Sequence, residues 1–326
     1  MLESFIYSFN SVAPIFLLVL VGMFLKKIKF LNQDFCSIAD KLVFKVALPM
    51  EMFLSVSGTD LDTIFTKENA GLIGFFIIGI VLAFAILCLV SPPVLKSNYK
   101  CGAFIQGSFR GNFAIFALPL TTNMFGDAGK IAATMMMPIV TIMFNILAVT
   151  GFGIFAPKEG KKKKSEMLKE ILISIVKNPL IIGIMIGFAF SILRTELKVT
   201  VPSFALKSLD DISSLAIPLA LLSIGVNFNP QNLKGRIGTA MLSMSIKNII
   251  LPVIAVSIGV LMGYRGIELS LLLVSFGSPT SVSSYIMAKN MHSDYELAGQ
   301  ILLLTTVFSL LTMFLFIFVL KQFAFI

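Results

Sequence analysis

The chain reads QGSFRGN at residues 106–112, within its first half, and SFGSPTS at residues 275–281, within its second half. Both stretches place small or polar residues inside segments that are otherwise apolar. Glycine and proline disturb the hydrogen-bond ladder of a helix, and in lipid each freed backbone group is costly unless another group satisfies it. Such breaks occur where they line a cavity within the protein, so we expect two interrupted helices with a polar site between them. An ordinary kink, padded by serine side chains, is the alternative.

The segments around these stretches predict an all-α membrane protein. Hydrophobic residues make up 57% of the 326 residues and charged residues 13%, whereas a soluble domain has roughly a quarter charged residues. A helix needs roughly 17–25 residues to cross a bilayer. Apolar runs of this length predict ten transmembrane helices, at residues 8–27, 36–56, 70–91, 100–123, 130–155, 169–193, 204–226, 236–263, 266–288 and 296–320.

Matches between the two halves of the chain indicate an internal repeat. Ser108-Phe109 recurs as Ser275-Phe276, 167 residues later. Further matches, at offsets of 165, 169 and 167, join Pro14 and Gly22 to Pro179 and Gly187, ALP at 47–49 to AIP at 216–218, and Asn123 and Asp127 to Asn290 and Asp294. Each repeat contains five helices, an odd number, so the second copy enters the membrane from the opposite side. We therefore expect two inverted five-helix repeats, residues 1–157 and 169–326, joined by a basic linker at 158–168.

The distribution of lysine and arginine predicts the orientation in the membrane. The loops after the first, third, fifth, seventh and ninth helices carry twice as many of these residues as the other side does. Positive loops face the cytoplasm, so both termini are expected outside and the basic loop 158–169 inside, as an anchor at the lipid headgroups. The net charge of +9 is thus a topology signal, and no nucleic-acid partner is expected.

Three charged residues fall inside the predicted helices, where a charge costs about 2.5–3.5 kcal/mol and normally faces a cavity or a partner. Arg110 lies between two glycines, and its guanidinium suits a carboxylate, although a structural ion pair or a snorkelling side chain is the alternative. Glu51 and Lys247 are candidates for coupling transport to a proton or an ion. They could instead pair with each other.

The two interrupted stretches supply the predicted substrate site. Its candidate residues are Gln106, Ser108, Arg110, Asn112, Ser278, Pro279, Thr280 and Ser281. The helix breaks themselves are predicted at Asn112, Pro119 and Pro279. Four further polar residues in the predicted helices are candidates for the same cavity or for hydrogen bonds between helices: Asn145, Ser223, Asn227 and Asn248.

Motifs of soluble enzymes are missing from the sequence. It has no G-x-S-x-G elbow, no H-E-x-x-H motif and no Walker A loop, which carry hydrolase, zinc and nucleotide chemistry. Its three cysteines are widely spaced and it has a single histidine. We therefore expect no enzymatic activity, no cofactor, no metal and no disulfide framework.

The short motifs that this chain does contain resemble those of the auxin efflux carrier family, in its bacterial branch. The resemblance covers nearly the whole chain in short motifs, which are ALP at 47–49, RGN at 110–112 with Pro119 and Phe125-Gly126, NPL at 178–180, AIP at 216–218 with SIG at 223–225, Lys247 with Pro252, and SPT at 278–280 through Ala288. The long cytoplasmic loop of the large plant members is absent.

This resemblance implies ten helices in inverted repeats. Helices 4 and 9 would be broken and would cross in a transport domain beside a scaffold domain, each domain drawn from both repeats. It also implies organic anions as substrates, such as malate, malonate or auxin-like carboxylates. Asn112 and Pro279 take the positions of the family's helix breaks at the crossover. Arg110 matches no family-wide motif, so its proposed role rests on local chemistry alone.

The sequence thus predicts a secondary transporter that moves a small carboxylate across the plasma membrane by an elevator-like, alternating-access motion. The implied partners are the carboxylate, H⁺ or Na⁺ as the coupling ion, and the lipid bilayer. A homodimer is one assembly that is compatible with a transporter of this kind. The alternative is a membrane sensor or assembly protein that uses a transporter fold without flux.

Overall fold

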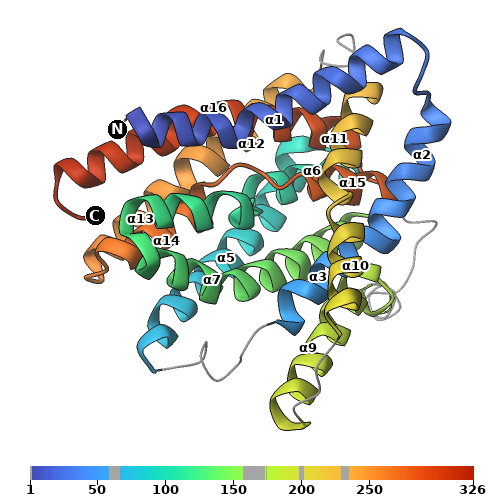
Figure 1. The fold of residues 1–326 in the computed structure, drawn as a ribbon. Coiled ribbons are helices and arrows are strands. Elements are labelled where there is room, and N and C mark those ends of the chain that lie inside the picture. Colours follow the sequence, from blue (N-terminus) through green and yellow to red (C-terminus); the bar gives the residue numbers. More distant parts are fainter. Residues whose placement is uncertain (1, 59–66, 157–172, 174, 198–201, 229–234) are drawn as a thin grey trace.

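The computed structural model describes residues 2–58, 67–156, 173, 175–197, 202–228 and 235–326 (Figure 1). The predicted linker 158–168 lies outside these residues. The described chain is helical throughout and contains no strand, apart from an isolated antiparallel bridge between Gly111 and Thr280. The predicted all-α class is therefore confirmed for this part of the chain, whereas the number of membrane crossings stays a prediction.

The described elements are numbered as in Figure 1. They are α1 (Leu2–Lys27), α2 (Gln33–Leu42), η1 (Val43–Ala47), α3 (Leu48–Ser57), α5 (Lys67–Leu95), α6 (Asn98–Phe109), α7 (Phe113–Phe155), α9 (Pro179–Leu197), α10 (Ser203–Ser213), α11 (Ala216–Asn227), α12 (Ile237–Ser245), η3 (Ile246–Ile250), α13 (Leu251–Leu261), α14 (Gly266–Gly277), α15 (Ser283–Asn290) and α16 (Tyr295–Gln322).

Six helical segments of the described chain are long and apolar enough to cross a membrane. They are Asn69–Leu95, Leu120–Phe155, Pro179–Glu196, Ser203–Asn227, Ile237–Leu261 and Tyr295–Gln322. Many large apolar side chains point outward, among them Leu89 and Leu261, which are 78% and 86% exposed. Water would disfavour such a surface, whereas lipid tails solvate it, as expected for a membrane protein.

Two wide π-helical turns each lead into a proline. The turn η1 precedes Pro49, and the turn η3 precedes Pro252. A proline ring clashes with the carbonyl of the residue four positions earlier, and that residue lies inside the π turn in both cases. The wider turn lets the helix continue past the proline. In η3 it also carries Lys247, which is buried in the protein interior.

Helices from the two halves of the chain pack together at glycines. Helix α1 lies along α11, and α3 lies along α9. A side chain at Gly22 of α1 would overlap the backbone at Leu222 of α11, and one at Gly187 of α9 would come within 2.9 Å of the Phe53 carbonyl oxygen of α3. Small residues allow such close approach between helices in membranes. We call α1, α2, α3, α9, α10 and α11, with η1, the first bundle.

The other helices form a second bundle, made of α5, α6, α7, α12, α13, α14, α15 and α16 with η3. Buried phenylalanine rings join its members. Phe276 of α14 contacts Phe76 of α5 with ring centroids 5.8 Å apart, and Phe109 of α6 lies 5.5 Å from Phe84 of α5. Figure 1 shows that α16 runs beside α1 along the edge where the two bundles meet.

The structure corrects one predicted helix break. Helix α7 continues through Pro119, and its backbone leaves helical dihedral angles at Gly126, where φ is 62° and ψ is −143°. A positive φ is easily accessible only to glycine. The chain therefore turns at Gly126 rather than at Pro119, and this single residue separates the two segments predicted as 100–123 and 130–155.

Substitution of Gly225 tests the close packing of α1 against α11. A Cβ atom at this position would overlap the Val19 carbonyl oxygen, so Gly225→Ala is expected to lower the free energy of unfolding by about 1–3 kcal/mol, as overpacking does. The matched control is Gly74 in α5, where a Cβ atom would meet nothing within 4 Å. Gly74→Ala should stabilise the protein by about 0.5–1 kcal/mol, because glycine is costly within a helix. Thermal unfolding of the purified protein measures both, and equal effects would contradict the predicted contact.

Candidate functional site

The two interrupted stretches meet in the centre of the molecule. Helix α6 ends at Phe109 and α7 begins at Phe113, while α14 ends at Gly277 and α15 begins at Ser283. The intervening segments pair, because the backbone N–H of Asn112 donates to the Pro279 carbonyl at 2.8 Å. These segments, 110–112 and 278–282, are called the crossing below.

Some of the predicted site residues hold the crossing together. The Thr280 hydroxyl donates to the Gly107 carbonyl at 2.7 Å, and its backbone N–H donates to the Thr305 hydroxyl at 3.1 Å. The Ser108 hydroxyl donates to the Phe104 carbonyl at 2.7 Å, and it lies within hydrogen-bond distance of the Ser243 hydroxyl, at 2.9 Å. Both hydroxyls thus satisfy groups within the second bundle, which leaves them little capacity for a ligand.

Other predicted residues are buried without a hydrogen-bond partner among the described residues. They include the side-chain amide of Gln106 and the Ser278 hydroxyl. A buried polar group that lacks a partner costs about 1–3 kcal/mol. Ser281 differs, because its hydroxyl lies 2.9 Å from that of Ser283 and is only partly buried. These groups are available for further interactions.

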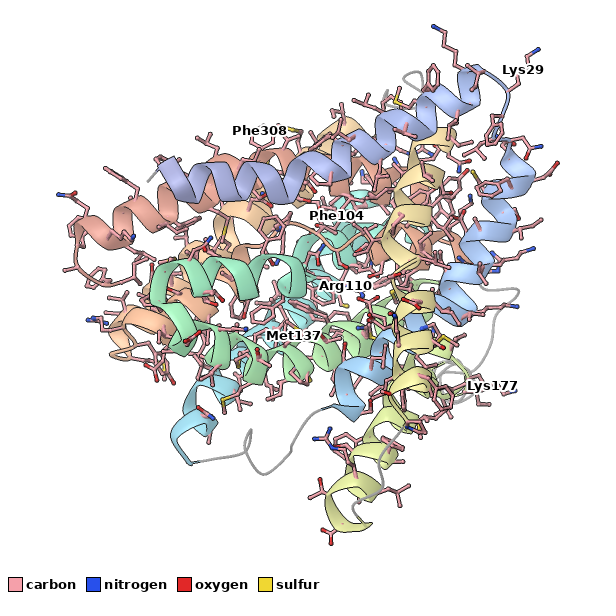
Figure 2. All side chains as sticks on the ribbon, viewed as in Figure 1. Lys29, Phe104, Arg110, Met137, Lys177 and Phe308 are labelled. Carbon is pink, nitrogen blue, oxygen red and sulfur yellow. The ribbon has the colours of Figure 1, made fainter. Side chains whose placement is uncertain are left out.

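Arg110 is a buried cation whose hydrogen-bond partners are all neutral. Its side chain is 3% exposed, and Nη2 donates to Asn145 Oδ1 at 2.9 Å and to Ser283 Oγ at 2.7 Å. Nη1 contacts the Met287 sulfur at 2.6 Å. Figure 2 shows Arg110 near the centre of the molecule, where both breaks lie. An arginine normally binds an acidic partner when buried, and within the described residues Arg110 has no carboxylate at ion-pair distance.

The first bundle contributes a wall to this arginine site. Glu51 of α3 and Arg110 interact electrostatically across the interface between the bundles. The amide nitrogen of Asn145 also contacts the Met52 sulfur of α3 at 3.0 Å. The arginine site, comprising Arg110, Asn145, Ser283 and Glu51, therefore lies between the two bundles. Sequence analysis named Asn145 as a candidate for this cavity but did not name Ser283, although the serine-rich stretch after Pro279 was a signal.

Lys247 lies at the C-terminal ends of α6 and α14. Its ammonium donates to the Phe276 carbonyl at 2.8 Å and to the Phe109 carbonyl at 3.2 Å, and it lies 5.8 Å from the centre of the Phe144 ring. The residue is 0% exposed. Lys247 forms no ion pair with any carboxylate that the structure describes. The considered pairing of Glu51 with Lys247 is therefore absent here, because Glu51 faces Arg110 while Lys247 binds helix-end carbonyls.

The remaining polar candidates stay within the packing of helices. The Asn248 amide donates to the Thr305 carbonyl of α16 at 2.7 Å, and the Asn227 amide donates to the Ser223 carbonyl of its own helix at 2.8 Å. Of the four such residues, only Asn145 contacts the arginine site.

A pocket of about 330 Å³ lies apart from the arginine site. It is lined mostly by apolar residues of α5, α7 and α14, together with Asn69 and Glu268. None of the predicted site residues lines it. Its lining offers no cation, so this pocket is unsuited to a small carboxylate.

A buried ion pair joins the two bundles at a second place. Asp40 of α2 is 2% exposed, and its carboxylate lies 2.5 Å from the Lys289 ammonium of α15. Lys289 also lies 5.9 Å and 5.4 Å from the ring centres of Tyr285 and Tyr295. From the sequence alone, Lys289 was interpreted only as one of the positive loop residues that indicate the orientation in the membrane. Its partner, far earlier in the chain, is apparent only from the fold.

Known membrane transport proteins are similar to this chain. A family model described as "Membrane transport protein" matches residues 7–317. An uncharacterized transporter of Methanocaldococcus jannaschii is 26% identical over 313 residues, covering 93% of this chain and 95% of its own length. An uncharacterized transporter of Methanothermobacter thermautotrophicus is 23% identical over 311 residues, covering 95% and 97%. A probable auxin efflux carrier component of Oryza sativa subsp. japonica is 24% identical over 151 residues, covering 44% of this chain and 25% of its own length.

The Asp40–Lys289 pair predicts unequal effects of two neutralising substitutions. Lys289→Met leaves a carboxylate that is 3% exposed without its partner, whereas Asp40→Asn leaves an ammonium that is 22% exposed. Breaking a buried pair so that a charge stays uncompensated costs about 3–5 kcal/mol, so Lys289→Met should lower the melting temperature more than Asp40→Asn. The double variant should recover part of the loss. A larger loss for Asp40→Asn, measured by thermal unfolding, would contradict the predicted pairing.

Proposed function

The chain belongs to the membrane transport protein family, that of the auxin efflux carriers, and we propose that it is a secondary transporter for a small organic anion. The observation that carries this proposal is Arg110, a buried cation with only neutral hydrogen-bond partners, at the point where two broken helices and two bundles meet. A buried charge without a counter-charge at ion-pair distance is unfavourable. A carboxylate ligand would provide that counter-charge.

We assign carboxylate binding to Arg110 together with Ser281 and Ser283. The two serine hydroxyls are 2.9 Å apart, and one of them already accepts from the guanidinium. Ser283 is the first residue of α15, and α7 begins three residues after Arg110. Free N–H groups and the positive end of the helix dipole favour anions at such helix starts. Gln106, Asn112, Ser278 and Pro279 complete the proposed site, with Ser108 and Thr280 holding its shape.

Ten helices in two inverted repeats are part of the proposal. In the proposed repeat, α1 is equivalent to α9 and α3 is equivalent to α11. The packing of α1 on α11 is therefore equivalent to the packing of α9 on α3, and both contacts are present. Gly22 contacts Gly225, and Gly187 contacts Val56. Gly187 follows Gly22 by the offset of 165, and Gly225 follows Val56 by the offset of 169. Phe109 and Phe276, offset by 167, both bind Lys247. Such equivalent contacts support the inverted repeats 1–157 and 169–326.

An elevator-like motion fits this arrangement. The first bundle would act as the scaffold, and the second bundle, which contains the crossing, would carry the anion. With both termini outside and the 158–169 loop cytoplasmic, Asp40 and Lys289 lie toward the cytoplasmic side. Their ion pair then closes that side in the present conformation and must break when the second bundle moves. The proposed location is the plasma membrane.

Coupling is assigned to Glu51 and Lys247, with H⁺ or Na⁺ as the driving ion. Glu51 shares the interface with Arg110, so binding of an anion at the guanidinium changes the electrostatic field at this carboxyl group. A protonated Glu51 would remove the competing negative charge beside the site. Anion binding and protonation would then favour each other, as coupled transport requires.

Arg110→Ala tests the anion site. Uptake of radiolabelled malate, malonate or indole acetate into proteoliposomes is expected to fall at least tenfold, because a hydrogen bond to a charged group is worth about 1.5–3 kcal/mol. The matched control is Arg194→Ala, which removes an exposed arginine at the end of α9 and should leave uptake unchanged. An unchanged elution profile shows that the variant is folded.

Retained uptake by Arg110→Ala would remove Arg110 from the site. Ligand-induced stabilisation of the wild-type protein without any uptake or counterflow would instead support a sensor or assembly protein with a transporter fold.

Glu51→Gln tests the coupling role separately. The amide imitates the protonated carboxyl group, so exchange of anion for anion across the vesicle membrane should persist. Accumulation driven by a pH gradient should be lost, since the variant cannot release a proton. Parallel counterflow and gradient-driven assays measure the two activities. Accumulation that still follows the imposed pH gradient would assign the proton to another residue.

A further inference from the structure

The two broken helices end at a common point. Helix α6 places the Phe109 carbonyl there, and α14 places the Phe276 carbonyl there. Both oxygens accept hydrogen bonds from one atom, Lys247 Nζ, at 3.2 Å and 2.8 Å. These carbonyls belong to the last helical turns, whose C=O groups lack partners within the helix.

The charge at this point is balanced by a single residue. A helix C-terminus carries the equivalent of about −0.5 elementary charge, so two converging C-termini present about −1. Lys247 contributes +1 and is fully buried. Since Lys247 has no ion pair within the described chain, its charge has no other counterpart here than the two helix ends.

Two further oxygen atoms lie close to Gly111, the residue next to the ammonium. A Cβ atom built on Gly111 would lie 3.1 Å from Lys247 Nζ and 3.3 Å from the Ser275 carbonyl oxygen, and it would overlap the Ser278 hydroxyl. The Ser278 side chain is 0% exposed and its hydroxyl has no partner in the described structure. Three backbone carbonyls and one hydroxyl thus lie around one small space that the absence of a side chain at Gly111 keeps open.

This set of ligands has the chemistry of an alkali-cation site. Hard cations bind carbonyl and hydroxyl oxygens, and unwound carbonyls with half-helix C-termini coordinate Na⁺ in transporters with broken helices. We propose that the crossing is a monovalent-cation site whose resident cation is the tethered ammonium of Lys247, so that Na⁺ enters this site only when the ammonium is removed.

The proposal refines the coupling role assigned above to Lys247. A tethered cation cannot leave with the substrate, so the wild-type crossing needs no bound Na⁺ to keep its helix ends together. This favours H⁺ over Na⁺ as the coupling ion. Its test measures cation binding by the purified protein rather than transport, so it can fail while the proposed function holds, and the reverse.

The experiment compares the thermal unfolding of wild-type protein and of Lys247→Ala in detergent. Each is measured in chloride salts of Na⁺, Li⁺, K⁺ and choline at one ionic strength. The wild-type melting temperature should be the same in Na⁺ and in choline. Lys247→Ala should melt several degrees lower in choline, and Na⁺ or another alkali cation should restore stability along a saturable curve. Lys247→Arg, which keeps the charge, should show no such dependence.

Two further variants identify the ligands of the bound cation. Ser278→Ala, added to Lys247→Ala, should raise the Na⁺ concentration required for half of the stabilisation at least threefold, because it removes a coordinating hydroxyl. The matched control is Ser275→Ala in the same background. The Ser275 hydroxyl donates to the Leu271 carbonyl of its own helix, so its removal should leave the Na⁺ response unchanged.

Three outcomes would overturn the proposal. One is a melting temperature of Lys247→Ala that is equal in alkali and choline salts. Another is specific stabilisation of the wild-type protein by Na⁺ that Lys247→Ala shows to the same degree, since the cation would then bind elsewhere. The third is failure of Lys247→Ala to fold in every salt while Lys247→Arg folds, because no alkali cation could then replace the ammonium.

Discussion

The need to satisfy the backbone at two helix breaks, inside a protein surrounded by lipid, shapes the centre of this molecule. Lipid offers these groups no hydrogen-bond partner, so the freed carbonyl and N–H groups depend on partners within the protein. The Asn112 N–H binds the Pro279 carbonyl, and Lys247 binds the carbonyls at the ends of α6 and α14. Each break thus supplies partners for the other, which explains why the two stretches have to meet.

The sequence was sufficient to predict these breaks, but not what each polar residue contacts. Glycine, serine and proline within apolar runs are a local signal, so 106–112 and 275–281 were identified correctly as polar interruptions. The contacts of Lys247, Asp40 and Lys289 depend on residues more than a hundred positions away or on other helices, and no local pattern encodes them. Glu51 illustrates the difference, since it interacts with Arg110 rather than with Lys247.

Proline alone was an unreliable predictor of where helices are interrupted. Pro119 lies inside a continuous helix, while Pro49 and Pro252 follow π turns that absorb the ring. The chain turns instead at Gly126, whose positive φ a larger residue would rarely adopt. A proline removes one N–H and can be accommodated by a wider turn. A backbone conformation in the left-handed region imposes a stricter requirement on residue type.

The two buried cations near the crossing differ in what surrounds them, and the proposed preference for anions rests on this difference. Lys247 faces two helix C-termini whose partial negative charges match its own charge, so that side is electrostatically complete. Arg110 faces Asn145, Ser283 and the starts of helices, which contribute no negative charge, and it shares the interface with one carboxyl group, Glu51. When Glu51 is protonated, the arginine site has a net positive charge, and it lies between the two bundles that the proposed motion would separate. A cation is repelled there, whereas a carboxylate replaces the missing counter-charge. The proposal of an anionic cargo thus rests on how the helix ends are distributed around the crossing rather than on Arg110 alone.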